Sequence, residues 1–481
     1  MISDRTICAV STPPGVGGVA VIRVSGPDVF TICDQLFVAG KPPVPISVSD
    51  ELIHEKRNSP EIQGKKLSDR PANTVVYGSI RRGGEVLDDV LVTVFQAPHS
   101  FTGEDVIEIS CHGSLYIQQQ LLQWLIEYGA CQARPGEFTQ RAFLNGKMDL
   151  SQAEAVADLI ASTSQGMHRL AMNQMRGGFS DELKQLRTQL LDFASLVELE
   201  LDFSDHEDLE FANHPALRAL AERIRNKITD LADSFSAGNA IKNGIPVVII
   251  GKPNVGKSTL LNTLLNEERA IVSDIPGTTR DTIEETIYIQ GQLFRFIDTA
   301  GLREKASSSI EALGIQRSFE KAEKASVILY LFDLTQEDTD ELVLTSQWLQ
   351  KFNKPILMIG TKNDIVRRSP IHTFGKVQAI HISCKIPADI ERVKNNIVRI
   401  ANVQNVAENE VVVTNVRHYE ALCRADESIG RVLDGLDENL PSDLLAQDIR
   451  ECLHYLGEIT GGEIATDEIL GNIFSKLCIG K

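Results

Sequence analysis

The segment that most constrains this chain is Gly251–Ser258, which fits the pattern GxxxxGK[ST]. It follows the apolar run Ile245–Ile250, which predicts a buried strand, and it precedes the helical run Thr259–Leu265. Glycines let backbone N–H groups curl around phosphates, and the following helix N-terminus adds positive potential. The segment therefore predicts a phosphate-binding loop in an α/β domain, in which Lys257 reaches the β and γ phosphates and Ser258 binds Mg²⁺.

Further short segments follow this loop in the order that GTPases use them: Gly277–Asp281, Asp298–Gly301, Thr361–Asp364 and Ser383–Lys385. Asp364 would accept two hydrogen bonds from the N1 and N2 donors of guanine. Adenine lacks these donors and would leave the carboxylate unpaired. The sequence therefore predicts that the nucleotide is GTP.

Switch residues are expected in the first two of these segments. Thr279 would close on Mg²⁺ and the γ-phosphate, Asp298 would face the Mg²⁺ ion, and Gly301 would donate its N–H to the γ-phosphate. The next position is Leu302, where many GTPases carry the glutamine that orients the attacking water. Because leucine cannot orient water, we expect another side chain and another cation to take over these tasks.

Length and charge limit the class of protein. A chain of 481 residues exceeds the roughly 250 to 300 at which one core stops growing, so about three domains are expected. The net charge of −18 has the wrong sign for binding nucleic acid by bulk charge, so any RNA contact must be local. No signal peptide or membrane span is apparent, and the eight cysteines form no CxxC pair, which predicts a cytoplasmic protein with no membrane partner.

Hydropathy patterns divide the chain into regions. Residues 1–113 alternate β-type runs with turns, which predicts strands at Ile7–Val10, Val19–Val24, Thr74–Ile80, Val90–Phe95 and Val106–Ser110. Residues 40–71 are polar and rich in proline, which predicts a long loop. Helical periods follow at Gln152–Ile160 and Leu183–Leu201 and return at Tyr419–Phe474, while strands and helices alternate from about 245 to 400.

These patterns predict a multi-domain α+β and α/β fold, with a β-rich N-terminal domain, an all-α central domain and an inserted P-loop GTPase domain. The expected boundaries are 1–147 for the first domain, 148–242 plus 401–481 for the helical domain, and 243–400 for the inserted domain.

Nearly end to end, the chain resembles the bacterial tRNA modification GTPase family MnmE, also called TrmE. Besides the GTPase segments, the resemblance is carried by Thr12–Gly15, Arg23–Gly26, Phe101–Asp105, Ala133–Phe138 and Cys478–Lys481. It implies an N-terminal domain that dimerises and binds 5-formyltetrahydrofolate, with methylene-tetrahydrofolate as the one-carbon donor. It also implies a homodimer, and a heterotetramer with an FAD-dependent subunit of the MnmG (GidA) type. This complex would add an aminomethyl-type group to carbon 5 of the wobble uridine of certain tRNAs.

The resemblance also implies site residues. The folate site would comprise Arg23, Glu108, Lys147 and Lys481. The charges fit, because the glutamyl tail of folate is anionic and the N–H edge of its pterin suits a carboxylate. A potassium ion would be held by Asn254, Ser273, Ile275 and Thr278, and Mg²⁺ by Ser258 and Thr279. Glu311 would be the catalytic residue, acting through a bridging water.

The complete set of expected GTP-binding residues comes from the phosphate loop, the switch segments and the guanine segments. It comprises Asn254, Val255, Gly256, Lys257, Ser258, Thr259, Ser273, Thr278, Thr279, Asp298, Thr299, Ala300, Gly301, Thr361, Lys362, Asp364, Ser383, Cys384 and Lys385.

Departures from the usual patterns occur at two of these motifs. Thr361 stands where GTPases commonly place asparagine, so a side-chain amide is missing beside Asp364. Where the family usually has Gly-His-Gly-Gly, this chain has Cys111–Ser114, which bears on the backbone freedom of that turn.

Two other functions stay open from the residues. A regulatory or ribosome-assembly GTPase without modification chemistry would share the GTPase segments, but such proteins usually append a basic RNA-binding module, and the C-terminal region here is acidic. A folate-dependent one-carbon transferase with a nucleotide-gated lid would share the N-terminal residues. It would turn over folate without tRNA.

Overall fold

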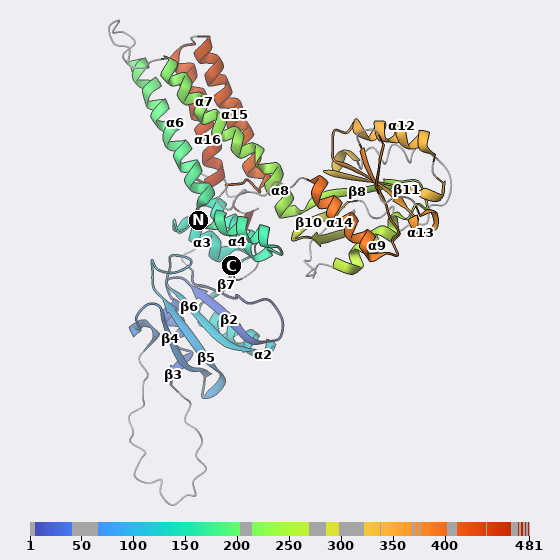
Figure 1. Ribbon diagram of the computed structural model, residues 1–481. Coiled ribbons are helices and arrows are strands. Elements are labelled where there is room, and N and C mark those ends of the chain that lie inside the picture. The colour runs from blue at the N-terminus through green and yellow to red at the C-terminus, as the bar shows by residue number, and fades with distance from the viewer. Residues whose placement is uncertain are drawn as a thin grey trace, which may run out of the picture. The chain divides into compact units, whose positions relative to one another are not determined.

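The computed structural model describes residues 5–40, 66–202, 214–268, 285–297, 322–336, 338–367, 371–374, 377–401, 411–438, 440–462, 470, 473–474, 477 and 480. Most of the expected 40–71 loop, residues 41–65, lies outside this set. The chain divides into two compact units, Met1–Ile160 with Gly457–Lys481, and Ala161–Leu456. Figure 1 shows the elements of both units.

The first unit contains a seven-stranded sheet in the order β3-β4-β5-β6-β2-β1-β7. Its strands are β1 (Ile7–Val10), β2 (Gly17–Ser25), β3 (Phe37–Ala39), β4 (Thr74–Arg82), β5 (Glu85–Phe95), β6 (Val106–Gly113) and β7 (Cys131–Gln132). Neighbouring strands are antiparallel except β1 and β7, which are parallel. The predicted β-rich N-terminal region is confirmed, and the central strands extend beyond the expected bounds.

Helices complete the first unit. They are α1 (Val29–Cys33), the 3-10 turn η1 (Leu67–Asp69), α2 (Leu115–Glu127), α3 (Glu137–Leu144) and α4 (Leu150–Ala161). Leu121 and Leu125, four residues apart on α2, are buried against the sheet core that includes Ile22, Val92 and Ile109. Hydropathy gave no helix for this segment, although the spacing of these leucines is the signal for one.

The C-terminal residues pack within the same unit. Leu470, Phe474 and Leu477 form one hydrophobic cluster with Leu150 and Ala153 of α4. Gly136, at the N-cap of α3, has φ +68°, and a Cβ there would lie 2.3 Å from the Phe474 carbonyl oxygen. The close approach explains why glycine stands at this position.

The second unit contains a set of helices that come from both sides of the α/β region. They are α5 (Gln165–Met175), α6 (Gly178–Asp202), α7 (His214–Asp233), α8 (Phe235–Asn243), α15 (Val416–Asp437) and α16 (Ser442–Thr460), of which α16 belongs to the second unit up to Leu456. Helices α7 and α15 lie side by side (Figure 1) and are joined by the pairs Arg218–Asp437 at 2.7 Å and Arg225–Asp426 at 3.4 Å. Residues before and after the insertion therefore pack together.

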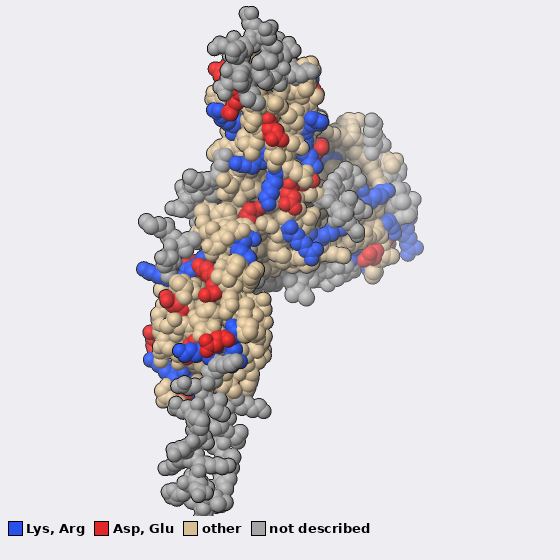
Figure 2. Space-filling view, turned by 90° about the vertical axis from the view of Figure 1, so that its left-hand side faces the viewer, with Lys and Arg blue, Asp and Glu red and all other residues tan. Residues whose placement is uncertain are grey.

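Ion pairs near the surface link these helices. Arg431 of α15 pairs with Asp448 of α16 at 2.7 Å, and Arg450 of α16 pairs with Glu198 of α6 at 2.5 Å. Figure 2 shows Lys and Arg side chains beside Asp and Glu side chains on the face that it draws. Exposed pairs of this kind contribute only about 0 to 1 kcal/mol each.

The α/β region holds the second seven-stranded sheet, in the order β13-β14-β12-β11-β8-β10-β9. Its strands are β8 (Ile245–Gly251), β9 (Glu285–Ile289), β10 (Gln292–Phe296), β11 (Val327–Asp333), β12 (Ile356–Thr361), β13 (Ile371–Phe374) and β14 (Val377–His381). The five inner strands are parallel, and β9 and β13 are antiparallel edges. The predicted α/β unit is confirmed.

Helices cover both faces of this sheet. They are α9 (Lys257–Glu268), η2 (Leu334–Gln336), α12 (Thr339–Gln350), α13 (Asn363–Val366) and α14 (Pro387–Ala401). Helices α9 and α14 share a core with Val247 and Ile249, whereas the alternate residues Val248 and Ile250 pack toward the face that α12 covers. Because both faces are buried, β8 is an almost continuous apolar run. No helix in the described part of the chain is long and apolar enough to cross a membrane.

Candidate functional site

The phosphate loop connects β8 to α9 and depends on special backbone conformations. Gly251 has φ +152°, and a Cβ there would lie 2.2 Å from the carbonyl oxygen of Leu331 on the neighbouring strand β11. Gly256 has φ +96° and Asn254 has φ +62°. Since residues with a side chain rarely adopt such angles, glycine at positions 251 and 256 permits the turn that the motif predicted.

Lys257, the first residue of α9, folds back over this loop. Its Nζ donates to the carbonyl oxygens of Gly251 and Lys252, both at 2.7 Å. Lys252 in turn pairs with Glu341 of α12 at 2.5 Å. Ser258 and Thr259 follow in the first turn of α9, where backbone N–H groups and the helix dipole favour an anion.

Thr361 ends β12 and ties the phosphate loop to the sheet. Its side chain is buried, and Oγ1 lies 2.7 Å from the Val255 carbonyl oxygen and 3.1 Å from the Phe332 carbonyl oxygen. A hydroxyl has one proton for these two acceptors, whereas an amide would have two. Threonine thus keeps the connection to the loop without an amide group.

Lys362 follows with a left-handed backbone, φ +63°, and its ammonium binds Asp333 at the end of β11. Thr335 also donates to Asp333, through its N–H at 2.9 Å and its hydroxyl at 2.7 Å. Burial opposes the charge of Asp333, but the bonds from Lys362 and Thr335 outweigh it and lower the pKa of this carboxyl. Sequence reasoning missed Asp333, although it is the polar last residue of an apolar strand.

The two guanine segments meet at the ends of adjacent strands β12 and β14. Oδ2 of Asp364 lies 3.0 Å from Nζ of Lys385, and the hydrogen bonds from Lys385 and Ser383 lower the pKa of the Asp364 carboxyl. The Ser383 N–H donates to Asp389 of α14 at 2.7 Å. Burial is the main reason why the pKa of the Cys384 thiol is raised, and the negative charges of Asp364 and Asp389 raise it further.

These loops share one edge of the sheet, because β8, β11, β12 and β14 are parallel and end there together. Ligands of open α/β sheets bind at this edge. The structure thus brings the described phosphate-loop residues 254–259 together with 361–364 and 383–385. The other expected residues of this site lie outside the described residues: Ser273, Ile275, Thr278, Thr279, Asp298, Thr299, Ala300, Gly301 and Glu311.

A second candidate site lies in the first unit, where Arg23 of β2 and Glu108 of β6 are direct cross-strand partners. Nε and Nη2 of Arg23 lie 2.9 and 2.8 Å from Oε1 of Glu108, and the two side chains are only 16% and 26% exposed. Nη1 of Arg23 donates to the Gly480 carbonyl at 3.4 Å, and the Ser11 hydroxyl donates to the same oxygen at 3.2 Å. Gly480, near the end of the sequence, therefore lies at this pair.

Aromatic rings complete the surroundings of Arg23. Its guanidinium carbon lies 5.1 Å from the ring centre of Phe101 and 5.6 Å from that of Phe138, distances at which cation–π attraction operates. Among the described residues, Lys147 makes no hydrogen bond to Arg23 or Glu108. Its Nζ donates to the Pro98 carbonyl at 2.9 Å, in the loop that carries Phe101. Lys481 lies outside the described residues.

The turn at Cys111–Ser114 accommodates its departure from the family pattern. Gly113 is needed, because a Cβ there would lie 2.3 Å from the Gly17 carbonyl oxygen across a β-bulge. Ser114 is the N-cap residue of α2 with φ −72° and ψ +133°, an extended conformation open to any residue. Glycine is therefore not required at position 114.

Comparison with known proteins gives two family matches. Residues 6–147 match the family described as GTP-binding protein TrmE N-terminus, and residues 150–478 match the MnmE helical domain. A solved structure of the translation elongation factor SelB from Methanococcus maripaludis shares 20% identity over 33% of this chain and 34% of its own, with a TM-score of 0.23, which is too low to support an argument.

Similar curated proteins extend over the whole chain. The protein from Parabacteroides distasonis is 54% identical over 99% of this chain and all of its own. Those from Cytophaga hutchinsonii and Bacteroides fragilis are 51% and 50% identical, covering 99% and 100% of this chain and 98% and 100% of their own. All three are named tRNA modification GTPase MnmE. With this identity over the full length, the chain belongs to the tRNA modification GTPase MnmE family.

Proposed function

We propose that this protein binds and hydrolyses GTP and that the hydrolysis is coupled to tRNA modification. GTP binding is supported by one observation: three loops meet at one edge of the sheet. Thr361 is hydrogen-bonded to the phosphate loop there, and Asp364 pairs with Lys385. Loop N–H groups and Lys257 would bind the phosphates, and Asp364 would accept from the guanine edge. The relatives from Parabacteroides distasonis and Cytophaga hutchinsonii are named for this activity.

Two cations belong to this proposal, although only one proposed ligand of each, Ser258 and Asn254, lies among the described residues. Ser258, in the first turn of α9, and Thr279 would hold Mg²⁺, which would neutralise phosphate charge. Asn254, exposed on the loop with a left-handed backbone, would join Ser273, Ile275 and Thr278 around K⁺. We expect Glu311 to orient the attacking water through a bridging water, in place of Leu302.

Potassium dependence has a direct test. GTP turnover is measured in KCl and in NaCl at equal ionic strength, with the Asn254→Ala variant beside the wild type. We expect faster turnover in KCl for the wild type and a smaller difference for the variant, because the carboxamide oxygen is a ligand of the proposed cage. Equal wild-type rates in the two salts would refute the potassium site.

For the N-terminal site we propose 5-formyltetrahydrofolate as the ligand, with methylene-tetrahydrofolate as the one-carbon donor. Arg23 and Lys147 suit the anionic tail. Both contacts from Arg23 to Glu108 use Oε1, so Oε2 can accept from the N–H edge of a pterin. Folate would supply the one-carbon unit, and these side chains would bind and orient it.

In this proposal the protein is a cytoplasmic homodimer, which joins an FAD-dependent subunit of the MnmG type in a heterotetramer. This complex would add an aminomethyl-type group to carbon 5 of the wobble uridine of certain tRNAs, with GTP hydrolysis driving a conformational cycle. The N-terminal ion pair and the nucleotide site, held in one chain, support such coupling.

Nucleoside mass spectrometry of tRNA from cells that lack this protein tests the proposal. We expect the 5-substituted wobble uridine to disappear. An unchanged nucleoside profile would overturn it and favour a regulatory GTPase without modification chemistry. Folate turnover by the pure protein without tRNA would favour a one-carbon transferase instead.

A further inference from the structure

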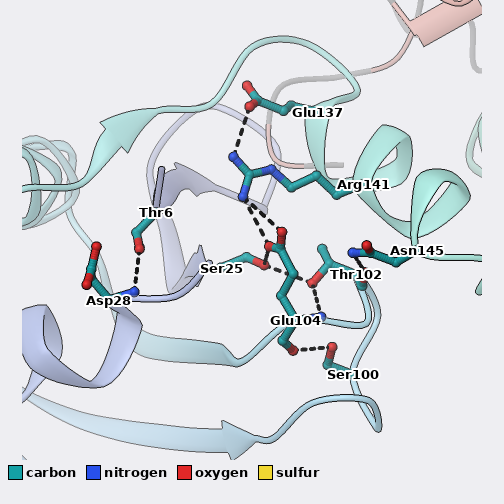
Figure 3. Close-up of polar contacts among 9 residues, drawn as sticks. All are labelled: Thr6, Ser25, Asp28, Ser100, Thr102, Glu104, Glu137, Arg141 and Asn145. Atoms are coloured by element: carbon teal, nitrogen blue, oxygen red, sulfur yellow. Dashed lines mark hydrogen bonds and ion pairs between the residues drawn. The ribbon is translucent and has the colours of Figure 1, made fainter. Parts of the chain in front are cut away.

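Arg141 of α3 is a charged side chain in an unusual position, because it is only 1% exposed. Its guanidinium lies between two carboxylates (Figure 3). Nη1 lies 3.1 Å from each oxygen of Glu104, and Nη2 lies 3.2 Å from Oε1 of Glu137. A buried guanidinium is costly unless it is paired, and here Glu104 and Glu137 supply its charged partners.

Glu104 belongs to the connection between β5 and β6, residues 96–105, and is fixed from several sides. The Ser25 hydroxyl of β2 donates to Oε2 of Glu104 at 2.7 Å and lies 2.8 Å from the Thr102 hydroxyl. The Asn145 amide, after α3, donates to the Thr102 carbonyl at 2.7 Å (Figure 3). One end of this loop is therefore tied to β2, to α3 and to the turn after α3.

The same loop contacts both cationic residues of the proposed folate site. Phe101 lies against the guanidinium of Arg23, and the Pro98 carbonyl accepts from Lys147. Gly103 has φ +78°, and a Cβ there would lie 3.3 Å from Cγ of Lys147. The orientation of Arg23 and of Lys147 thus depends on where this loop lies.

We propose that Arg141 is the positioning residue of the N-terminal site. By holding Glu104 it sets the loop 96–105, so that Phe101 orients Arg23 and the Pro98 carbonyl orients Lys147 toward the carboxylates of a reduced folate. Arg141 is buried and acts only through these neighbours. The inference rests on the proposed function of the N-terminal site.

Lysine cannot replace Arg141 in this role, although it keeps the charge. The guanidinium uses two nitrogens to reach three oxygens of Glu104 and Glu137, whereas an ammonium is a single point. Arg82→Lys is the matched control, since Arg82 of β4 pairs with Glu127 and stacks near Trp124 and contacts none of the loop residues.

Calorimetric titration of the full chain with 5-formyltetrahydrofolate is the first test. We expect Arg141→Lys to raise Kd by about 10- to 100-fold, the scale seen when residues that orient metal ligands are changed. Asn145→Ala removes one exposed anchor of the loop and should raise Kd about fivefold, as for one hydrogen bond, even if Arg141→Lys folds poorly. Arg82→Lys should bind like the wild type, and GTP hydrolysis should be unchanged in all three.

Hydrogen exchange over residues 97–106, measured without ligand, is the second test. We expect faster exchange in Arg141→Lys and Asn145→Ala than in Arg82→Lys. If the wild type does not bind the folate, the proposed ligand is wrong, and the exchange rates alone decide the role of Arg141. Exchange at the wild-type rate in both variants would overturn the positioning role, whether or not their folate binding changes. If the wild type binds the folate, wild-type affinity in both variants would overturn it as well.

Discussion

The nucleotide site and the N-terminal site hold their charged side chains in different ways. At the nucleotide site, Lys257 donates to carbonyl groups of the phosphate loop. Lys385, whose side chain is 82% exposed, pairs with Asp364. At the N-terminal site, the side chain of Arg23 is 16% exposed and lies between Glu108 and two aromatic rings. The side chain of Arg141 is only 2% exposed and lies between two carboxylates. One site is built mainly from backbone conformation and the other from buried side-chain pairs.

This difference separates two consequences of mutation. Exposed ion pairs contribute little to folding, so substitutions at the nucleotide site should change ligand binding with little effect on stability. Breaking a part-buried pair leaves a desolvated charge, so substitutions at the N-terminal site should change both.

Asp364→Asn should have the largest effect on binding. It replaces a charged acceptor with an amide, so GTP affinity should fall about 10²- to 10⁴-fold, the scale of two hydrogen bonds to a charged group, while the melting temperature stays near wild type. Xanthosine triphosphate, which carries a carbonyl where guanine has its amino group, should bind the variant better than GTP. Titration with both nucleotides checks this, and wild-type GTP affinity in the variant would remove Asp364 from the guanine site.

Glu311→Ala should reduce turnover rather than affinity. We expect kcat for GTP to fall by roughly 10² or more, the usual scale of general acid–base assistance, with GTP affinity near wild type. Glu304→Ala is the matched control in the same segment. If the control loses turnover and Glu311→Ala does not, the role belongs to Glu304.

Glu108→Gln should lower stability as well as folate binding. The change leaves the Arg23 guanidinium without its charged partner in a part-buried position, which should cost about 1 to 3 kcal/mol of unfolding free energy. Denaturant unfolding of the full chain measures this cost beside Asp364→Asn. Equal stability of the two variants would erase the contrast between the sites.

Thr361→Asn should have a smaller effect. An amide can donate to both the Val255 and the Phe332 carbonyls, so GTP binding should tighten by at most about 1 kcal/mol, and the preference for GTP over ATP should stay the same. A titration in which the variant binds GTP more weakly would count against this assignment.

The smallest effect concerns pH. Because the pKa of Asp364 is lowered, its contribution to GTP binding should persist at mildly acid pH and disappear only as pH falls through that lowered value. Lys385→Met removes the main cause, so the loss should move to higher pH. GTP affinity is measured by titration at a series of pH values. If it falls over the same acid range in the variant and the wild type, Lys385 does not lower the pKa of Asp364.

Local patterns in the sequence predicted much of the fold. The strand Ile7–Val10 has the expected bounds, and Ile245–Gly251 extends its expected run by one residue. These segments are recognisable because strand and loop chemistry are local. Helix α2 was not predicted, although Leu121 and Leu125, four residues apart, are the local signal for it.

Long-range contacts could not be predicted in this way. The ion pair of Arg23 with Glu108 depends on the register of β2 and β6, which local periodicity does not specify, and only the family resemblance pointed to both residues. Burial of Arg141 depends on Glu104, 37 residues earlier in the chain. An arginine beside polar residues resembles a surface residue until that partner is known.

The central claim is that one chain needs both sites for a single reaction on tRNA. The most direct test is nucleoside mass spectrometry of tRNA from cells whose only copy of the protein carries Asp364→Asn or Glu108→Gln, with Arg82→Lys as the control. We expect both site variants, present at the control's abundance, to lack the 5-substituted wobble uridine that the control restores. Full modification in cells with either site variant would contradict the account.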